Sequence, residues 1–404
     1  MEFLRKHHEK FSTGLLLVAI FLAGFAVGGI TPGITFAQDN FAIGDTDEAF
    51  APLYEVFETI QARYVDTDNV EIDTLIDGAI EGMVDSLGDP YSGYLDAEAF
   101  NMFSSDLSGD IEGIGVVIFT NDDDNVEVRQ VLEGTGAEAA GVLPGDVFAD
   151  VDGTDVLGMD QTELALLVRG EAGTTVNVTF LRDGEEVTLE ITRVRFEVPN
   201  VEYEVFEDSN IAYISMAEFN ERSVEQFNDA LEAVEIDQRD GLIFDLRNNP
   251  GGLLSTAIDM ASVFIDDGVI LYESFADGSE QTFEANGSYA GIEVPIVVLI
   301  NENSASASEL VSGAMRDQGV ATLIGEVSFG KGTVQTLQPL SNNGALRITI
   351  ARYLLPSRLW IHDVGVTPDI IVELDELNFV DGDPDPQLEA AIDYILDGDL
   401  TSDQ

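Results

Sequence analysis

"VPIVVLINENSASASELVSGAMRDQ" (residues 294–318) contains a strand, a turn and a helix in direct succession. Its first part is a continuous apolar run, which is typical of a buried strand, and its second part has the apolar spacing of an amphipathic helix. The same order occurs where "GLIFDLR" (241–247) leads through "NNPGG" into "LLSTAIDMASVFI" (253–265), and "ATLIGE" (321–326) adds another strand. Repeated strand–turn–helix units predict an α/β layer architecture for residues 197–375.

The remaining segments divide the chain by their periodicity. Apolar residues recur at helical spacing over residues 46–105, which predicts a small helical arm within residues 41–105. Short alternating runs and glycine turns fill residues 106–196 and predict a small β-rich module. A further amphipathic pattern, "PQLEAAIDYIL", lies in the tail at residues 376–404 and predicts a C-terminal helix.

The composition excludes several classes of function. The chain carries 77 acidic and 17 basic residues, for a formal net charge of −60. Such a surface repels nucleic-acid phosphates, and its even spread along the chain indicates a solvated surface suited to a salty environment. The absence of cysteine excludes disulfides and thiol chemistry, and with only three histidines no metal site is expected. We expect no cofactor.

An uncharged segment begins the chain. Residues 11–38 carry no charge, include "GLLLVAIFLAGFAVGGI" (14–30), and follow Arg5, Lys6 and Lys10. This pattern fits an uncleaved membrane anchor or a signal peptide, and a buried core helix is a third alternative. The first two interpretations both predict that residues 1–40 are a targeting segment and that the rest is exported, either membrane-anchored or secreted.

Lys331 is the only lysine after residue 10, and it lies between two glycines in "GEVSFGKGTVQ" (325–335). A phosphate-binding loop would need Ser or Thr next and then a helix, but Gly332 follows, and then "TVQTLQPL", which alternates like a strand. A solvated surface lysine is a second alternative. The third, which we favour, is a general base: burial lowers the pKa of a lysine, which can then accept a proton from a serine hydroxyl.

Three serines are candidates for that hydroxyl. Ser304, Ser306 and Ser308 lie between the strand and the helix of the opening stretch. Unpaired N–H groups at a helix N-terminus favour an oxyanion, although serines there also act simply as helix caps. The glycines of "RNNPGG" (247–252) follow a second strand and could supply another N–H group. These residues alone do not distinguish the three serines.

Taken together, the motifs resemble those of the carboxy-terminal processing proteases, also called tail-specific proteases. The resemblance covers nearly everything after residue 45 and rests on "SLGDPYSGYL", "GIGVVI", "LPGDVFADVDG", "LIFDLRNNPGGLL", "NENSASASELVSGAMRDQG", "GEVSFGKGTVQ" and "VGVTPDI", in that order. It implies a crotonase-like α/β protease core with an inserted PDZ domain and an N-terminal helical arm. Members of this family cut proteins near their C-termini without metal or ATP.

The resemblance assigns the catalytic roles. It places the nucleophile at Ser306, the general base at Lys331, and the glutamine that orients the lysine at Gln335. Its oxyanion donors are the backbone of Ala307 and of a glycine in "NNPGG", which is either Gly251 or Gly252. The segment "PSRLWIHDVGVTPD" departs from the family by being bulkier than the expected glycine-containing turn.

The PDZ domain has candidate peptide-binding residues of its own. Backbone N–H groups of four consecutive residues before a strand could hold a terminal carboxylate while the peptide adds as an edge strand: Gly113, Ile114, Gly115 and Val116. Arg169 has three interpretations: it pairs with that carboxylate, it pairs with the protease core, or it complements the dipole of the helix that precedes it.

The sequence therefore predicts an exported serine endopeptidase that cleaves proteins near free C-terminal tails, which the PDZ domain binds. The alternative is an exported scaffold that binds C-terminal tails and whose protease core is silent. The helical arm and the C-terminal helix are candidate contact surfaces for a homo-oligomer.

Overall fold

The computed structural model of the chain describes residues 46–374 and 385–398, apart from residues 67–69, 122–124, 183 and 198–199. The targeting segment predicted for residues 1–40 lies outside the described residues. Among the helices that are described, none has the length and apolar character needed to cross a membrane.

A six-stranded sheet forms the centre of the larger domain. Its strand order is β10-β11-β12-β15-β16-β19, and every neighbouring pair is parallel except the antiparallel pair of β10 with β11. The buried runs expected from the sequence are confirmed as its inner strands. The bounds are β10 (Val201–Phe206), β11 (Ile211–Met216), β12 (Gly241–Asp245), β15 (Ile296–Ile300), β16 (Thr322–Gly325) and β19 (Ile370–Ile371).

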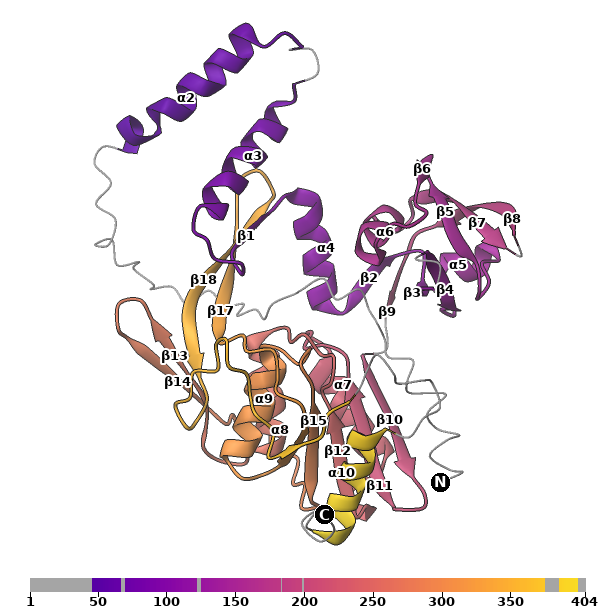
Figure 1. Ribbon diagram of the computed structural model, residues 1–404, viewed down its shortest axis with the longest axis vertical. Coiled ribbons are helices and arrows are strands. Elements are labelled where there is room, and N and C mark those ends of the chain that lie inside the picture. The colour runs from indigo at the N-terminus through magenta and orange to yellow at the C-terminus, as the bar shows by residue number, and fades with distance from the viewer. Residues whose placement is uncertain are drawn as a thin grey trace.

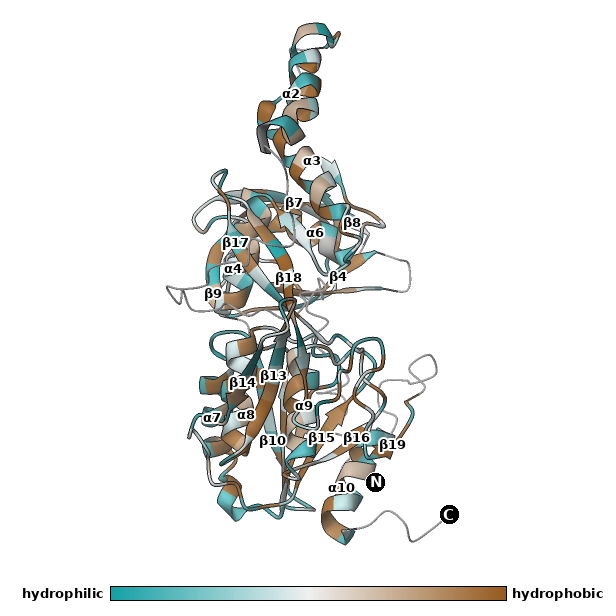
Figure 2. Cartoon of the chain, turned by 90° about the vertical axis from the view of Figure 1, so that its left-hand side faces the viewer, coloured by the Kyte–Doolittle hydropathy of each residue, from teal (hydrophilic) through white to brown (hydrophobic). Residues whose placement is uncertain are grey.

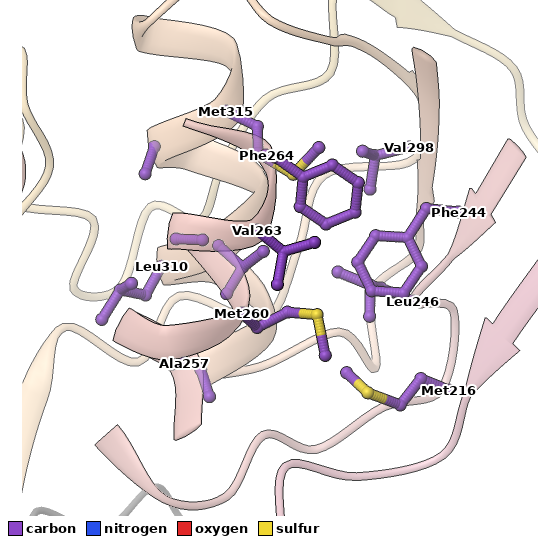
Figure 3. Packing of buried hydrophobic residues seen from close by; sticks show 14 of the residues in the cluster. Met216, Phe244, Leu246, Ala257, Met260, Val263, Phe264, Val298, Leu310 and Met315 are labelled. Carbon is purple, nitrogen blue, oxygen red and sulfur yellow. The ribbon is translucent and has the colours of Figure 1, made fainter. Parts of the chain in front are cut away.

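Helices cover both faces of this sheet, which confirms the α/β layers. Figure 3 shows Phe244 and Val298 of the strands contacting Met260 and Phe264 of α8. Residues of opposite parity, such as Ile243 and Val297, instead contact α10 on the other face. The helices on the first face are α7 (Ser223–Ala233), α8 (Leu254–Phe264) and α9 (Ala307–Asp317), and α10 spans Pro386–Asp397.

A second, antiparallel sheet rises from the core as a long ribbon toward the N-terminal helices (Figure 1). The sequence predicted a strand after Lys331, and that strand is β17. The five-stranded assembly itself was not predicted, because it joins segments far apart in the chain. Its strands are β1 (Gly93–Leu95), β13 (Val269–Phe275), β14 (Glu280–Glu284), β17 (Thr333–Pro339) and β18 (Ala345–Leu354).

The helical periodicity before residue 105 is confirmed by α2 (Thr46–Arg63), α3 (Ile72–Asp85) and α4 (Ala97–Ser108). In Figure 2, α2 projects from the molecule with apolar residues on its surface. Helix α4 instead contacts the protease domain, where Phe103 packs with Leu253.

The β-rich module has a core of its own and a sheet with the order β3-β4-β5-β7-β8, to which β6 adds beside β5. Strand β3 lies at the edge of this sheet and α6 contacts it. A separate ribbon, β2 with β9, links the module to the rest of the chain. The bounds are β2 (Asp110–Gly113), β3 (Val116–Thr120), β4 (Val126–Val131), α5 (Gly136–Ala140), β5 (Val147–Val151), β6 (Thr154–Asp155), α6 (Gln161–Val168), β7 (Thr175–Arg182), β8 (Glu185–Thr192) and β9 (Val194–Glu197).

Candidate active site

Ser306 lies where β15 gives way to α9, beyond the carboxyl edge of the parallel sheet. Ligands of open α/β sheets bind at this edge. Ser306 is 5% exposed and has φ of +53° and ψ of −107°, a positive-φ conformation that non-glycine residues rarely adopt. Its carbonyl oxygen accepts a hydrogen bond from the Tyr353 hydroxyl at 3.1 Å. Such strain in a well-buried turn is typical of residues held for function.

The neighbouring serines have other contacts. The Ser304 hydroxyl donates to the carbonyl of Leu246 at 2.8 Å, and the Ser308 hydroxyl donates to the carbonyl of Asn249 at 2.9 Å. Both hydroxyls therefore fasten the turn of α9 to the loop after β12. This distinguishes them from Ser306 in a way that the residue pattern could not.

Lys331 lies in the loop between β16 and β17, and only 2% of its surface is exposed. Burial lowers the pKa of Lys331 well below its usual range, and the nearby charge of Arg347 lowers it further. Its Nζ lies 4.9 Å from the centre of the Tyr91 ring. The burial excludes a solvated surface lysine, and the strand that follows excludes a phosphate-binding loop.

The two glycines beside Lys331 are explained by close contacts with the segment "PSRLWIHDVGVTPD". A Cβ atom at Gly332 would lie 2.8 Å from Trp360 Nε1, and one at Gly330 would lie 2.9 Å from the backbone nitrogen of Gly365. Trp360 Nε1 also donates a hydrogen bond to the Gly332 carbonyl at 2.8 Å. The bulky segment of residues 356–369 therefore packs closely against the lysine loop and leaves no room for a side chain at Gly330 or Gly332.

Glu309 is a site residue that the sequence analysis missed. Its buried carboxylate accepts hydrogen bonds from the backbone N–H groups of Ser306 at 2.7 Å and Lys331 at 2.9 Å. It also accepts from the Gly330 N–H and the Ser328 hydroxyl. Burial raises the pKa of Glu309, and these hydrogen bonds oppose that effect. One carboxylate thus joins the serine turn to the lysine loop.

Gln335 lies on β17 with its side chain fully buried. Its Nε2 donates to the hydroxyls of Thr333 and Thr349, each at 3.0 Å, which leaves Oε1 as a free acceptor. Neither Gln335 Oε1 nor Lys331 Nζ has a hydrogen-bond partner among the described residues. Lys331 is therefore hydrogen-bonded to neither Gln335 nor Ser306 in this structure.

The "NNPGG" loop lies against the serine turn. A Cβ atom at Gly251 would lie 2.9 Å from the backbone nitrogen of Ala307, so the two segments touch. The N–H of Gly251 already donates to Asn249 Oδ1 at 2.9 Å. The N–H of Gly252 has no acceptor within the described ranges, whereas its neighbours Gly251 and Leu253 form the backbone hydrogen bonds to Phe219. These contacts favour Gly252 over Gly251 as the oxyanion donor.

The candidate peptide-binding residues of the PDZ domain join β2 to the edge strand β3. Ile114 is buried in the core of the module, and its carbonyl accepts from the N–H of Ala137 at 2.8 Å. Gly115 has φ of +87°, and a Cβ atom there would lie 2.2 Å from Thr135 Cβ. Val116 begins β3, which pairs with β4 and with no other described strand, so its second edge is unpaired in the described part of the sheet.

Arg169, just beyond α6, forms a buried ion pair with Asp106 of α4. Its Nη1 lies 2.8 Å from both carboxylate oxygens of Asp106. Glu218, on the loop after β11, shares this site, and burial raises its pKa to about 7. The arginine therefore links the PDZ domain to α4 and the protease domain. It does not face the open edge of β3 as a free cation.

Comparisons with known proteins place this geometry in a family. The sequence pattern of peptidase family S41 matches residues 210–372, that of the activating protease CtpB N-terminal domain matches residues 35–99, and that of a PDZ domain matches residues 113–192. The chain is 36% identical over 342 residues to the carboxy-terminal processing protease CtpA of Bacillus subtilis (strain 168), with 83% of this chain and 72% of that protein covered.

Two further proteins to which the chain is similar are also C-terminal processing proteases. The carboxyl-terminal-processing protease of Synechocystis sp. is 35% identical over 329 residues, covering 79% of this chain and 77% of that protein. The solved structure of the photosystem II D1 C-terminal processing protease matches with a TM-score of 0.51 and 26% identity, covering 87% of this chain and 98% of that chain.

The fold and the comparisons define a serine-type peptidase that carries a PDZ domain. The chain belongs to peptidase family S41 and is a carboxy-terminal processing protease.

Proposed function

We propose that this protein is an endopeptidase that cleaves exported proteins near their C-termini, with Ser306 as nucleophile, Lys331 as general base and Gln335 as the residue that orients the lysine. The observation that carries the proposal is the burial of Lys331. The only lysine after residue 10 is enclosed, has no hydrogen-bond partner, and has a pKa well below its usual range. A neutral amine of this kind can act as a base at neutral pH.

The proposed reaction has two stages. Lys331 Nζ takes the proton of the Ser306 hydroxyl while Oγ attacks the carbonyl carbon of the scissile bond, and the N–H groups of Ala307 and Gly252 stabilise the oxyanion. The lysine then gives its proton to the departing amine, which leaves an acyl group on Ser306. Water, deprotonated by Lys331, then attacks the acyl carbon. The bond to Ser306 Oγ breaks, the lysine returns its proton to that oxygen, and the new C-terminus is released.

Peptide binding must complete the hydrogen bonds that this chemistry needs. Lys331 Nζ and Gln335 Oε1 are a donor and an acceptor, both buried and both unpartnered. We expect substrate to bring the lysine to Ser306 and Gln335, because an unpaired buried polar group is costly. The PDZ domain would receive the substrate tail along β3, next to Gly113–Val116, and gate the site. Arg169 would hold the tail carboxylate only if its ion pair with Asp106 opened.

The same proposal extends to the whole molecule. It includes a crotonase-like protease core at residues 197–375, a PDZ domain at residues 106–196, a helical arm at residues 41–105 and a tail at residues 376–404. It also includes export, with membrane contact through residues 1–40, and a homo-oligomer formed through the arm or the C-terminal helix.

Cleavage of an unfolded protein with an apolar C-terminal tail tests the proposal. We expect Ser306→Ala and Lys331→Ala to lower kcat/KM by about 10⁴-fold while remaining folded by circular dichroism. Ser308→Ala should keep measurable activity, because that hydroxyl binds the Asn249 carbonyl. Tail binding by the wild-type chain without any cleavage would instead favour the silent scaffold.

A further inference from the structure

Arg347 is a half-buried arginine on β18 whose guanidinium has no hydrogen-bond partner among the residues that the structure describes. Its Nε is closed off from solvent and has no acceptor, and no carboxylate among the described residues forms an ion pair with it. Three other partly or fully enclosed arginines do pair with carboxylates: Arg169 with Asp106, Arg182 with Asp146, and Arg247 with Asp245.

An unpaired arginine is unexpected in this chain. Burial lowers the pKa of Arg347, which indicates that the charge is held without full compensation. Acidic residues outnumber basic ones by 77 to 17, so a structural partner would be easy to supply. An enclosed guanidinium that pairs with no carboxylate of its own chain is therefore a candidate to bind a carboxylate of a ligand.

Asp89, the acid whose charge acts on Arg347, already accepts hydrogen bonds from other groups. Asp89 influences Arg347 through its charge, but its carboxylate accepts hydrogen bonds from the Ser92 hydroxyl at 2.6 Å and the Tyr91 N–H at 3.0 Å. Asp89 thus orders the turn before β1 and leaves the guanidinium fork open.

Strand register places Arg347 beside the candidate active site. Arg347 lies opposite Leu337, and Thr349 lies opposite Gln335, so all four side chains share one face of the β17–β18 ribbon. The catalytic-site glutamine is therefore a near neighbour of the arginine.

The other neighbours of Arg347 are strand β1 on one side and a small apolar cluster beside Leu337 on the other. Gly93 on β1 is its partner on the far side, and a Cβ atom there would lie 3.5 Å from Arg347 Nη2. The adjoining Leu337 packs with Phe103 of α4 and with Leu253, which directly follows Gly252. This face of the ribbon therefore looks toward the loop that carries the candidate oxyanion donors.

We propose that Arg347 binds a carboxylate of the substrate polypeptide near the scissile bond. This inference rests on the proposed function, because it needs a peptide to lie between Ser306 and this face of the ribbon. A guanidinium fork binds carboxylates through paired hydrogen bonds, which gives both affinity and orientation. The carboxylate belongs either to an acidic side chain or to the C-terminus of the substrate.

Three peptide types distinguish these sources in a cleavage assay with the full chain. The first carries one Glu, moved position by position along the peptide, with an amidated C-terminus. The second carries Gln in its place, with the same amide. The third carries Gln and a free C-terminal carboxylate. Each is assayed with the wild type, Arg347→Gln and Arg347→Lys, and with the control Arg352→Gln, which removes an exposed arginine of the same strand that lies over the Trp360 ring.

We expect Arg347→Gln to lower kcat/KM about tenfold for one of the carboxylate peptides, mainly through KM, and to leave the neutral peptide nearly unchanged. Arg347→Lys should recover part of the preference, and Arg352→Gln should retain all of it. Equal losses for all three peptides, or an unchanged preference, would overturn the proposal.

A binding measurement separates this inference from the proposed function. In the Ser306→Ala background, fluorescence anisotropy with the same peptides should show the carboxylate preference with Arg347 and lose it with Arg347→Gln. If the wild type cuts no peptide but this difference in binding persists, the proposed chemistry fails and the carboxylate site stands. If the wild type cuts peptides but binding and cleavage ignore the carboxylate, the site fails alone.

Discussion

At the scale of single residues, the candidate site depends on how buried polar groups are satisfied. Glu309 is fully buried, yet its carboxylate accepts from both the serine turn and the lysine loop. Lys331 is almost as buried, and its Nζ has no hydrogen-bond partner in the described part of the chain. One residue therefore holds the geometry while the other stays free to react.

The substitution Glu309→Gln tests whether this carboxylate positions Ser306 and Lys331. An amide keeps one acceptor oxygen but turns its NH₂ group toward N–H groups, so either orientation leaves buried donors unpaired. We expect the free energy of unfolding to fall by roughly 1–3 kcal/mol and kcat to fall about 100-fold as Ser306 and Lys331 lose alignment. Urea unfolding and peptide cleavage measure both effects.

Glu302→Gln is the matched control, since Glu302 is exposed and lies in the same turn. It should leave stability and kcat within experimental error. A Glu309→Gln protein with wild-type kcat would show that the carboxylate does not position the site.

At the scale of elements, local sequence patterns predicted the individual strands and helices, but they did not predict which distant segments pair with one another. The buried strands β12 and β15 and the helices α8 and α9 follow from short apolar runs, so the sequence predicted the core layers. The Ser306-x-x-Glu309 spacing is a helix-capping pattern that could have indicated Glu309. The pairing of β1 with β18 and the contact of Arg169 with Asp106 join residues far apart in the chain, and no local signal specifies them.

The junction of β2 and β3 gives a prediction about the PDZ domain. Gly115→Ala places a Cβ atom 2.2 Å from Thr135 Cβ, so we expect it to destabilise the module by about 1–3 kcal/mol beyond the backbone strain. Hydrogen exchange across β3 measures the loss, and binding of C-terminal tail peptides should weaken with it.

Gly134→Ala provides the comparison. Gly134 also has a positive φ, of +76°, but a Cβ atom there meets no heavy atom within 4 Å. Gly134→Ala should therefore lower the free energy of unfolding only by the cost of the backbone strain. If the two substitutions destabilise the module equally, Thr135 must move away from the added Cβ atom without a cost in stability.

At the scale of the whole molecule, the net charge of −60 makes stability depend on salt. Exposed acids repel one another over a Debye length of about 10 Å at 0.1 M salt and about 3 Å at 1 M. Salt should therefore stabilise the full chain by about 1 kcal/mol or more, which is seen as a rise in Tm of about 2 °C. Thermal unfolding in NaCl and KCl at equal ionic strength checks this: the two curves should rise together, and a Tm that is flat or falls with salt would exclude self-repulsion as a limit on stability.

The central claim is that Lys331 activates Ser306, and labelling with a serine-directed fluorophosphonate tests it most directly. Only the neutral lysine accepts a proton. The labelling rate should therefore rise with pH and level off above the pKa of Lys331, which burial holds well below 10.5. Mass spectrometry should locate the adduct at Ser306, and Lys331→Met should abolish the labelling. An adduct on another serine, or an unchanged pH profile in Lys331→Met, would contradict the account.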